Sequence, residues 1–127
     1  TASEFEFLPV DVNLQRCQRY YEKSYNLSVA PGTITEIGQS RFFYANTTSG
    51  YQGGNITFSV KKRTSATITS YAPTTGASGN ANYFVFGSST SVGSVTIQQQ
   101  SERCFNYYGN GISCDSSGLQ YTADAEL

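Results

Sequence analysis

From residue 33 onward, apolar and polar residues alternate in short runs, a pattern typical of half-buried β-strands. Clusters of Gly, Ser, Asn and Pro, which favour turns, separate these runs. The runs are "TITEIG", "SRFFYAN", "NITFSVKK", "ATITSYA", "NYFVFG", "SVTIQQQ", "RCFNYY" and "LQYTADAEL". About eight strands at this spacing predict an all-β fold, a β-sandwich or jelly roll, over residues 33–127.

The first 32 residues follow a different pattern. "FEFLPV" alternates apolar and acidic residues before a proline, which predicts a connector strand within residues 1–12. Asp11 or Asn13 could then cap a short helix over residues 13–25. Its apolar positions recur at spacings of three and four: Leu14, Cys17, Tyr20 and Tyr21. With 127 residues, the chain is expected to form a single domain.

The composition excludes several kinds of chemistry. A net charge of −1 gives no bulk attraction to nucleic acid or to an anionic membrane. The chain has no His, so it cannot build a Ser-His-Asp site and it lacks the commonest zinc ligand. No apolar run approaches the length of about 20 residues that a membrane helix needs. We therefore expect no enzymatic activity, no metal, no cofactor, no nucleic-acid partner and no membrane insertion.

The three cysteines leave two interpretations open. Cys104 and Cys114 flank "FNYYGNGIS" as if across a hairpin, so they form either a disulfide or two separate thiols. Cys17 lies on the apolar stripe of the expected helix, where a small buried thiol is the simplest interpretation. No nearby His or thiol would make it a nucleophile.

Two segments rich in Tyr, Gly and Asn are candidate carbohydrate-binding loops. These are "GYQGGN" at residues 50–55 and "FNYYGNG" at residues 105–111. An aromatic ring can stack on the C–H face of a sugar while amides bond its hydroxyls. The candidate glycan contacts are Tyr51, Asn55, Tyr107, Tyr108 and Asn110. Ordinary packing of these rings is the alternative.

Three stretches carry a family resemblance. "FEFLPVDVNLQRCQRYYEKSYN", "FSVKKRTSATITSYAPTTGASGN" and the ending "YTADAEL" resemble, in this order, the C-terminal domains of phage tail-fibre and related virion proteins. Ala66 stands where that family usually has Pro. The resemblance is absent in "RFFYANTTSGYQGG" and "CFNYYGNGISC", which are typical of variable loops.

The resemblance implies a β-rich terminal domain of a viral fibre, exposed on the virion and assembled as a homotrimer. Its partners would be copies of itself, the upstream fibre shaft and host-cell surface carbohydrate. The stripe of Leu14, Cys17, Tyr20 and Tyr21 is then expected to pack under the sheets or against neighbouring copies. No catalytic residue belongs to the family pattern.

Three functions remain to be compared. The first is a non-enzymatic, receptor-binding tip of a phage tail fibre that recognises host-surface glycan. The second is a structural trimerisation cap or a capsid-decorating head-fibre domain without a receptor site of its own. The third, a fragment of a polysaccharide-degrading enzyme, is the weakest, because the sequence offers no pair of acidic residues spaced across a cleft.

Overall fold

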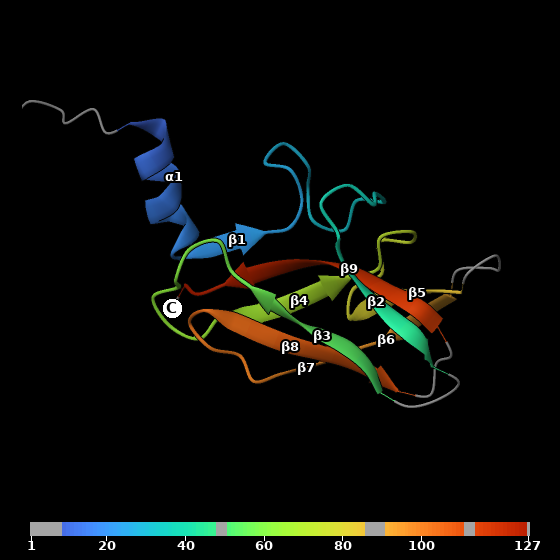
Figure 1. Cartoon of the computed structure of the whole chain (residues 1–127). Helices are drawn as coiled ribbons and strands as arrows, with labels where there is room; N and C mark the ends of the chain where they lie inside the picture. Colours follow the sequence, from blue (N-terminus) through green and yellow to red (C-terminus); the bar gives the residue numbers. More distant parts are fainter. Residues whose placement is uncertain (1–8, 48–50, 86–90, 111–113, 127) are drawn as a thin grey trace, which may run out of the picture.

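A computed structural model describes residues 9–47, 51–85, 91–110 and 114–126 (Figure 1). In these ranges one short helix is followed by nine strands. In chain order the elements are α1 (Val10–Gln18), β1 (Tyr21–Lys23), β2 (Ser40–Thr47), β3 (Tyr51–Thr57), β4 (Thr67–Tyr71), β5 (Asn80–Phe84), β6 (Ser91–Ser94), β7 (Thr96–Gln98), β8 (Cys104–Asn110) and β9 (Cys114–Asp124). The prediction of an all-β fold with one short N-terminal helix is confirmed.

The strands form two facing sheets. The larger sheet is built around the long strand β9: β2 and β5 flank its first half, while β1 and β4 flank its second half. β6 extends this sheet by pairing with β5, and every pairing is antiparallel. The smaller sheet has the order β3-β8-β7 and lies below the larger one in Figure 1. The result is a sandwich whose larger sheet has β9 at its centre.

The core lies between the two sheets and follows the two-residue period of the strands. From β9, Leu119, Tyr121 and Ala123 point inward, and from β8 the buried Phe105 meets them. The rings of Phe105 and Tyr121 meet edge to face, with centroids 5.2 Å apart. Burying each such large side chain contributes about 1.5–3 kcal/mol, so this layer supplies much of the driving force for folding.

The opposite face of β9 is covered by the coil that follows β1. The fully buried Gln120 donates from Nε2 to the carbonyl oxygens of Thr35 (3.1 Å) and Ile37 (2.8 Å). Its Oε1 accepts a hydrogen bond from the Ser24 hydroxyl. The strand expected over residues 33–38 is therefore wrong: this segment forms no strand and instead satisfies a buried amide of the sheet.

The helix begins and ends earlier than expected. It starts at Val10, after Pro9 as its N-cap residue, and it ends at Gln18, so the predicted span of 13–25 is wrong. Residues Tyr21–Lys23 form β1 instead and pair with β9. The edge of β9 offers unpaired backbone groups, and a Tyr-containing segment suits such a strand better than a helix. The prediction of a connector strand over residues 1–12 is wrong from Val10 onward, where the helix has begun. Residues 1–8 of that prediction lie outside the described ones.

The apolar stripe of α1 does not pack under the sheets. No residue of α1 is buried, and Leu14 and Cys17 are exposed. Tyr20 and Tyr21, which follow the helix, are also exposed. Figure 1 shows α1 standing at the side of the sandwich, above β1. This part of the expectation is wrong within one chain, whereas a contact with neighbouring copies stays a prediction.

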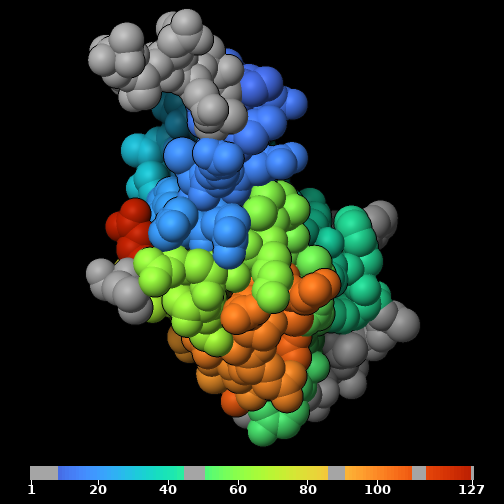
Figure 2. All heavy atoms as spheres, turned by 90° about the vertical axis from the view of Figure 1, so that its left-hand side faces the viewer, coloured from blue at the N-terminus to red at the C-terminus, as the bar shows by residue number. Residues whose placement is uncertain are grey.

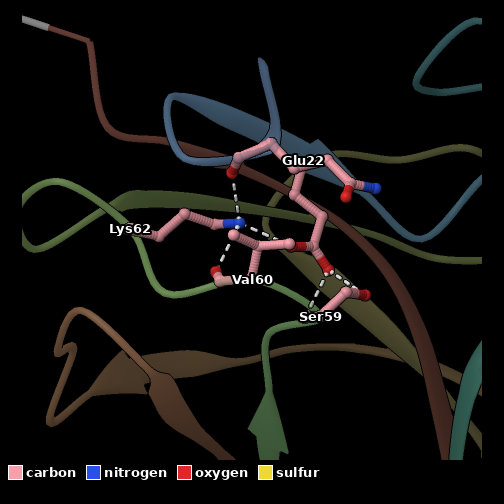
Figure 3. Close-up of polar contacts among 5 residues, drawn as sticks. Glu22, Ser59, Val60 and Lys62 are labelled. Atoms are coloured by element: carbon pink, nitrogen blue, oxygen red, sulfur yellow. Dashed lines mark hydrogen bonds and ion pairs between the residues drawn. The ribbon is translucent and has the colours of Figure 1, made fainter. Parts of the chain in front are cut away.

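A buried ion pair holds the helical end of the chain to the sandwich (Figure 3). Lys62, on the loop between β3 and β4, pairs with Glu22 of β1 and donates to the carbonyl oxygen of Gln18 at 2.6 Å. Glu22 Oε1 accepts from the backbone N–H and the hydroxyl of Ser59, at 3.0 and 2.9 Å. Figure 2 shows the blue N-terminal segment resting on this green loop, with the orange strand region beneath. Both charges are satisfied by specific partners, which a buried pair requires.

Candidate functional site

The two candidate carbohydrate-binding segments lie side by side as strands. β3 and β8 pair in antiparallel register, with Tyr51 opposite Asn110 and Asn55 opposite Asn106. The prediction that these segments are loops is wrong, because their described residues belong to strands and each segment buries a side chain, Gln52 in the first and Phe105 in the second. The pairing turns two distant sequence segments into one continuous surface on the outer face of the smaller sheet.

An aromatic pair lies at one end of this surface, where β3 begins and β8 ends. The rings of Tyr51 and Tyr108 meet edge to face, with centroids 5.2 Å apart and an interplanar angle of 79°. Together with Gln98 of β7 they line an open hollow of about 330 Å³. The Tyr51 side chain is 73% exposed, so its ring is available to a ligand. We call this place the Tyr51/Tyr108 hollow.

A glycine on β3 permits a close approach to β8 beside the aromatic pair. Gly53 lies opposite Tyr108 in the β3–β8 register. A Cβ atom at this position would lie 1.9 Å from the carbonyl oxygen of Tyr107, so the two backbones can approach only because the residue is glycine.

A row of side-chain amides borders the aromatic pair. Asn55 Nδ2 donates to Asn106 Oδ1 at 2.6 Å, and Asn106 Nδ2 donates in turn to Gln99 Oε1. Gln98 lies opposite Asn106 in the β7–β8 register. These amides hold one another in place and keep further donor and acceptor capacity for hydroxyl groups. Sequence reasoning missed Asn106 and Gln98, although the alternation in "CFNYY" puts Asn106 on the same face as Tyr108.

Two of the candidate glycan contacts, Tyr107 and Asn110, are not placed on this surface by the described structure. Tyr107 is 1% exposed, and its hydroxyl shares a 2.8 Å hydrogen bond with Ser117 Oγ, so its prediction as a glycan contact is wrong. Neighbouring residues of a strand point to opposite faces, and Tyr107 therefore faces the core where Tyr108 faces outward. Burial raises the pKa of Tyr107 above the usual range of a phenol. For Asn110 the backbone pairs with Tyr51, while its side chain lies outside the described part of the structure.

The three cysteines are thiols, and the disulfide interpretation is wrong. Cys104 begins β8, whereas the chain reaches Cys114 from the other end of that strand, at Asn110. Six residue steps along a strand separate the two ends by about 20 Å, far beyond the reach of a disulfide. Hydrogen bonds from Ser101 and then Asn55 lower the pKa of the Cys104 thiol, whereas burial raises that of Cys114.

A second, smaller hollow lies beside the helix. It measures about 210 Å³ and is lined by Leu14, Cys17, Gln18, Tyr21, Glu22, Lys23 and Leu27. Leu27 is 72% exposed. Tyr20 does not line this hollow. Its ring lies under the Arg63 guanidinium, 5.4 Å from the ring centroid. The structure therefore brings three of the four stripe residues together and separates the fourth.

In comparisons with protein families, curated proteins and solved structures, none matches this chain. The resemblance to tail-fibre domains therefore stays a prediction. Within the described ranges, no helix has the length and apolar character needed to cross a membrane. Nor do the described residues bring together three or more side chains suited to hold a metal ion.

Proposed function

We propose that this chain is a non-enzymatic virion surface domain, the receptor-binding tip of a phage tail fibre, which binds host-surface glycan in the Tyr51/Tyr108 hollow. The observation that carries the proposal is the hollow on the outer face of the smaller sheet, which the paired rings of Tyr51 and Tyr108 line together with Gln98. The sequence resemblance supports the setting on a fibre, and the geometry supports the kind of ligand.

The hollow has the chemistry that sugar recognition needs. A pyranose ring presents C–H groups on one face, and these stack on an aromatic face such as that of Tyr51. Its hydroxyls lie at the ring edge, where the amides of Gln98 and Asn55 can donate and accept hydrogen bonds. Because the hollow is open and shallow, we expect it to bind one or two residues within a longer glycan, with affinity raised by several copies on a fibre.

A structural cap is the second candidate, and a specific observation favours it. Large apolar side chains lie exposed near α1, among them Val10 (84%) and Leu27 (72%). Such side chains suit a contact with other copies better than free contact with water. In that case the hollow would have no ligand of its own, and recognition would belong to another protein of the particle.

Binding to host cells and to a glycan array would test the two candidates. The variants are Tyr51→Ala and Tyr108→Ala, and the control is Val92→Ala, which removes an exposed side chain on β6, away from the hollow and from the stripe on α1. We expect saturable binding by the native domain, weakened at least about tenfold in both test variants, since stacking carries most of the affinity. The control should bind like the native domain. Absence of binding by the folded native domain, or equal loss in Val92→Ala, would favour the structural cap.

A further inference from the structure

A second polar-aromatic cluster lies on the outer face of the larger sheet. Phe43 of β2 and Phe84 of β5 both lie opposite Ser116 of β9, so these residues form one row across three strands. Arg41 occupies the next outward position on β2 and extends toward this row. We call these four residues the Arg41 cluster.

The Arg41 guanidinium is held in a defined position. Its carbon lies 4.0 Å from the centroid of the Phe84 ring and 5.4 Å from that of Phe43. Its Nε and Nη2 donate to the Ser116 hydroxyl at 3.4 and 3.2 Å. Stacking and hydrogen bonds together fix the plane of the group, which lowers the entropy that a ligand would have to remove on binding.

No carboxylate in the described ranges forms a salt bridge with the positive charge of Arg41. The salt bridges among the described residues involve Lys61 and Lys62, and none involves Arg41. Nη1 of Arg41 donates to no acceptor in the described ranges, and Nη2 keeps a second hydrogen beyond the one directed at Ser116. The end of the guanidinium is thus open to a bidentate acceptor, which is the geometry that a carboxylate fits.

An exposed ring lies directly beside this charge. The Phe43 side chain is 78% exposed although it sits within a strand. A ring so placed offers a flat apolar face to a ligand, in the same way as Tyr51 does on the other sheet. A ligand that satisfies the cluster therefore combines an anionic group with an apolar face.

We propose that the Arg41 cluster binds a carboxylate-bearing sugar of an acidic polysaccharide. In such a sugar the carboxylate is attached directly to the pyranose ring, so one rigid group can pair with Arg41 while its C–H face lies on Phe43. An acidic peptide carries its carboxylate on a flexible stem and lacks that adjoining face. This site lies on the opposite sheet from the Tyr51/Tyr108 hollow, and the proposal does not depend on the function proposed for that hollow.

The test compares acidic polysaccharides with their own carboxyl-reduced forms. Polygalacturonate, alginate and polysialic acid would each be titrated by calorimetry at one fixed, low ionic strength, beside the reduced polymer. We expect the native domain to bind at least one of them about tenfold more tightly than its reduced form. Arg41→Ala should abolish this preference, and Phe43→Ala should weaken binding several-fold.

Control variants and a control ligand show whether binding depends on the Arg41 cluster itself. Arg103→Ala removes the same charge at another exposed arginine and should leave the preference unchanged. Tyr51→Ala should leave it unchanged too, which separates this proposal from the proposed function. Phe43→Ala removes an exposed ring and keeps the test valid even if Arg41→Ala folds poorly.

Equal binding of every acidic polymer and its reduced form would overturn the proposal. So would equal losses in Arg41→Ala and Arg103→Ala, or equally tight Arg41-dependent binding of polyglutamate, which would identify an acidic peptide as the partner.

Discussion

Lys61 and Lys62 are neighbours in sequence and have opposite environments. Lys61 pairs with Glu102 at the surface, with side chains 58% and 45% exposed. Lys62 is fully buried, pairs with Glu22 and lies 4.8 Å from the centroid of the Phe58 ring. Both residues are lysines paired with a glutamate, so comparing them measures what burial adds to an ion pair.

We expect Lys62→Ala to lower the free energy of unfolding by about 3–5 kcal/mol, because it leaves the Glu22 carboxylate buried without its partner. Lys61→Ala should cost less than about 1 kcal/mol, since its pair is exposed to water and salt. Urea unfolding at neutral pH measures both. Similar costs for the two variants would mean that the Glu22/Lys62 pair contributes little to the attachment of the N-terminal segment.

Tyr83 is a buried phenol whose hydroxyl has no hydrogen-bond partner among the described residues. Burial raises its pKa to about 12, against about 10 in an unfolded chain. Between these values the unfolded state releases the proton and the folded state keeps it, so the contribution of Tyr83 to stability is constant below pH 10 and falls as the pH rises toward 12. Tyr83→Phe should cost little at pH 7, because no hydrogen bond is lost.

The measurement is the urea midpoint of the native domain and of Tyr83→Phe from pH 7 to pH 11. The variant should lose less stability above pH 10 than the native domain does. Tyr107→Phe is the contrasting control: it removes the bond to Ser117 and should cost about 1 kcal/mol already at pH 7. An identical alkaline decline in Tyr83→Phe and the native domain would contradict the assignment.

The short helix α1 and the long strand β9 are held in very different ways. Leu14 of α1 is 36% exposed, whereas Leu119 of β9 is fully buried in the core. Leu119→Ala should lower the free energy of unfolding by about 2–5 kcal/mol, through lost burial and the cavity left behind. Leu14→Ala should cost under about 1 kcal/mol at low protein concentration. Equal costs would mean that α1 packs more closely than its exposure indicates.

The sequence pattern predicted the strands that bury one face, and it missed those that depend on pairing. The alternation in "SRFFYAN" and "ATITSYA" located β2 and β4 well, because one side of each strand faces the core. β1, β6 and the first residues of β3 have weaker patterns, and their conformation depends on the free edges of β9, β5 and β8. The predicted helix was too long because the sequence pattern does not reveal strand pairing: Tyr21 pairs with β9 instead of extending α1.

The candidate site was predictable in its residue types and less so in its membership. A search for Tyr, Asn and Gly together found Tyr51, Asn55 and Tyr108, and the structure brings all three to one face. Tyr107 was included because the segment was treated as a loop, in which neighbouring side chains need not alternate. The Arg41 cluster has no signature in sequence, since Phe43 and Phe84 meet across β9 only through strand pairing.

The exposed apolar residues bear on how the whole chain assembles. Large side chains that are two-thirds or more exposed occur on α1, on the coil after β1 and on strands: Val10, Leu27, Ile34, Ile37, Phe43 and Tyr51. Two of these have been assigned to proposed ligand sites, and the other four precede β2 in the chain. We propose that these four residues, on α1 and the coil that follows β1, belong to a surface for assembly that is separate from both proposed ligand sites.

We therefore expect a homotrimer, as the sequence resemblance implies, with this surface at the contacts between copies. Light scattering at micromolar concentration should give three times the mass of one chain. Leu27→Asp introduces a charge at an exposed apolar position and should reduce that mass to one chain, while Val92→Asp, at an exposed apolar position on β6, should leave it unchanged. A monomeric native domain at this concentration would remove both the trimer and the structural-cap alternative. The Tyr51/Tyr108 hollow would remain testable, because a single chain contains all of its described residues.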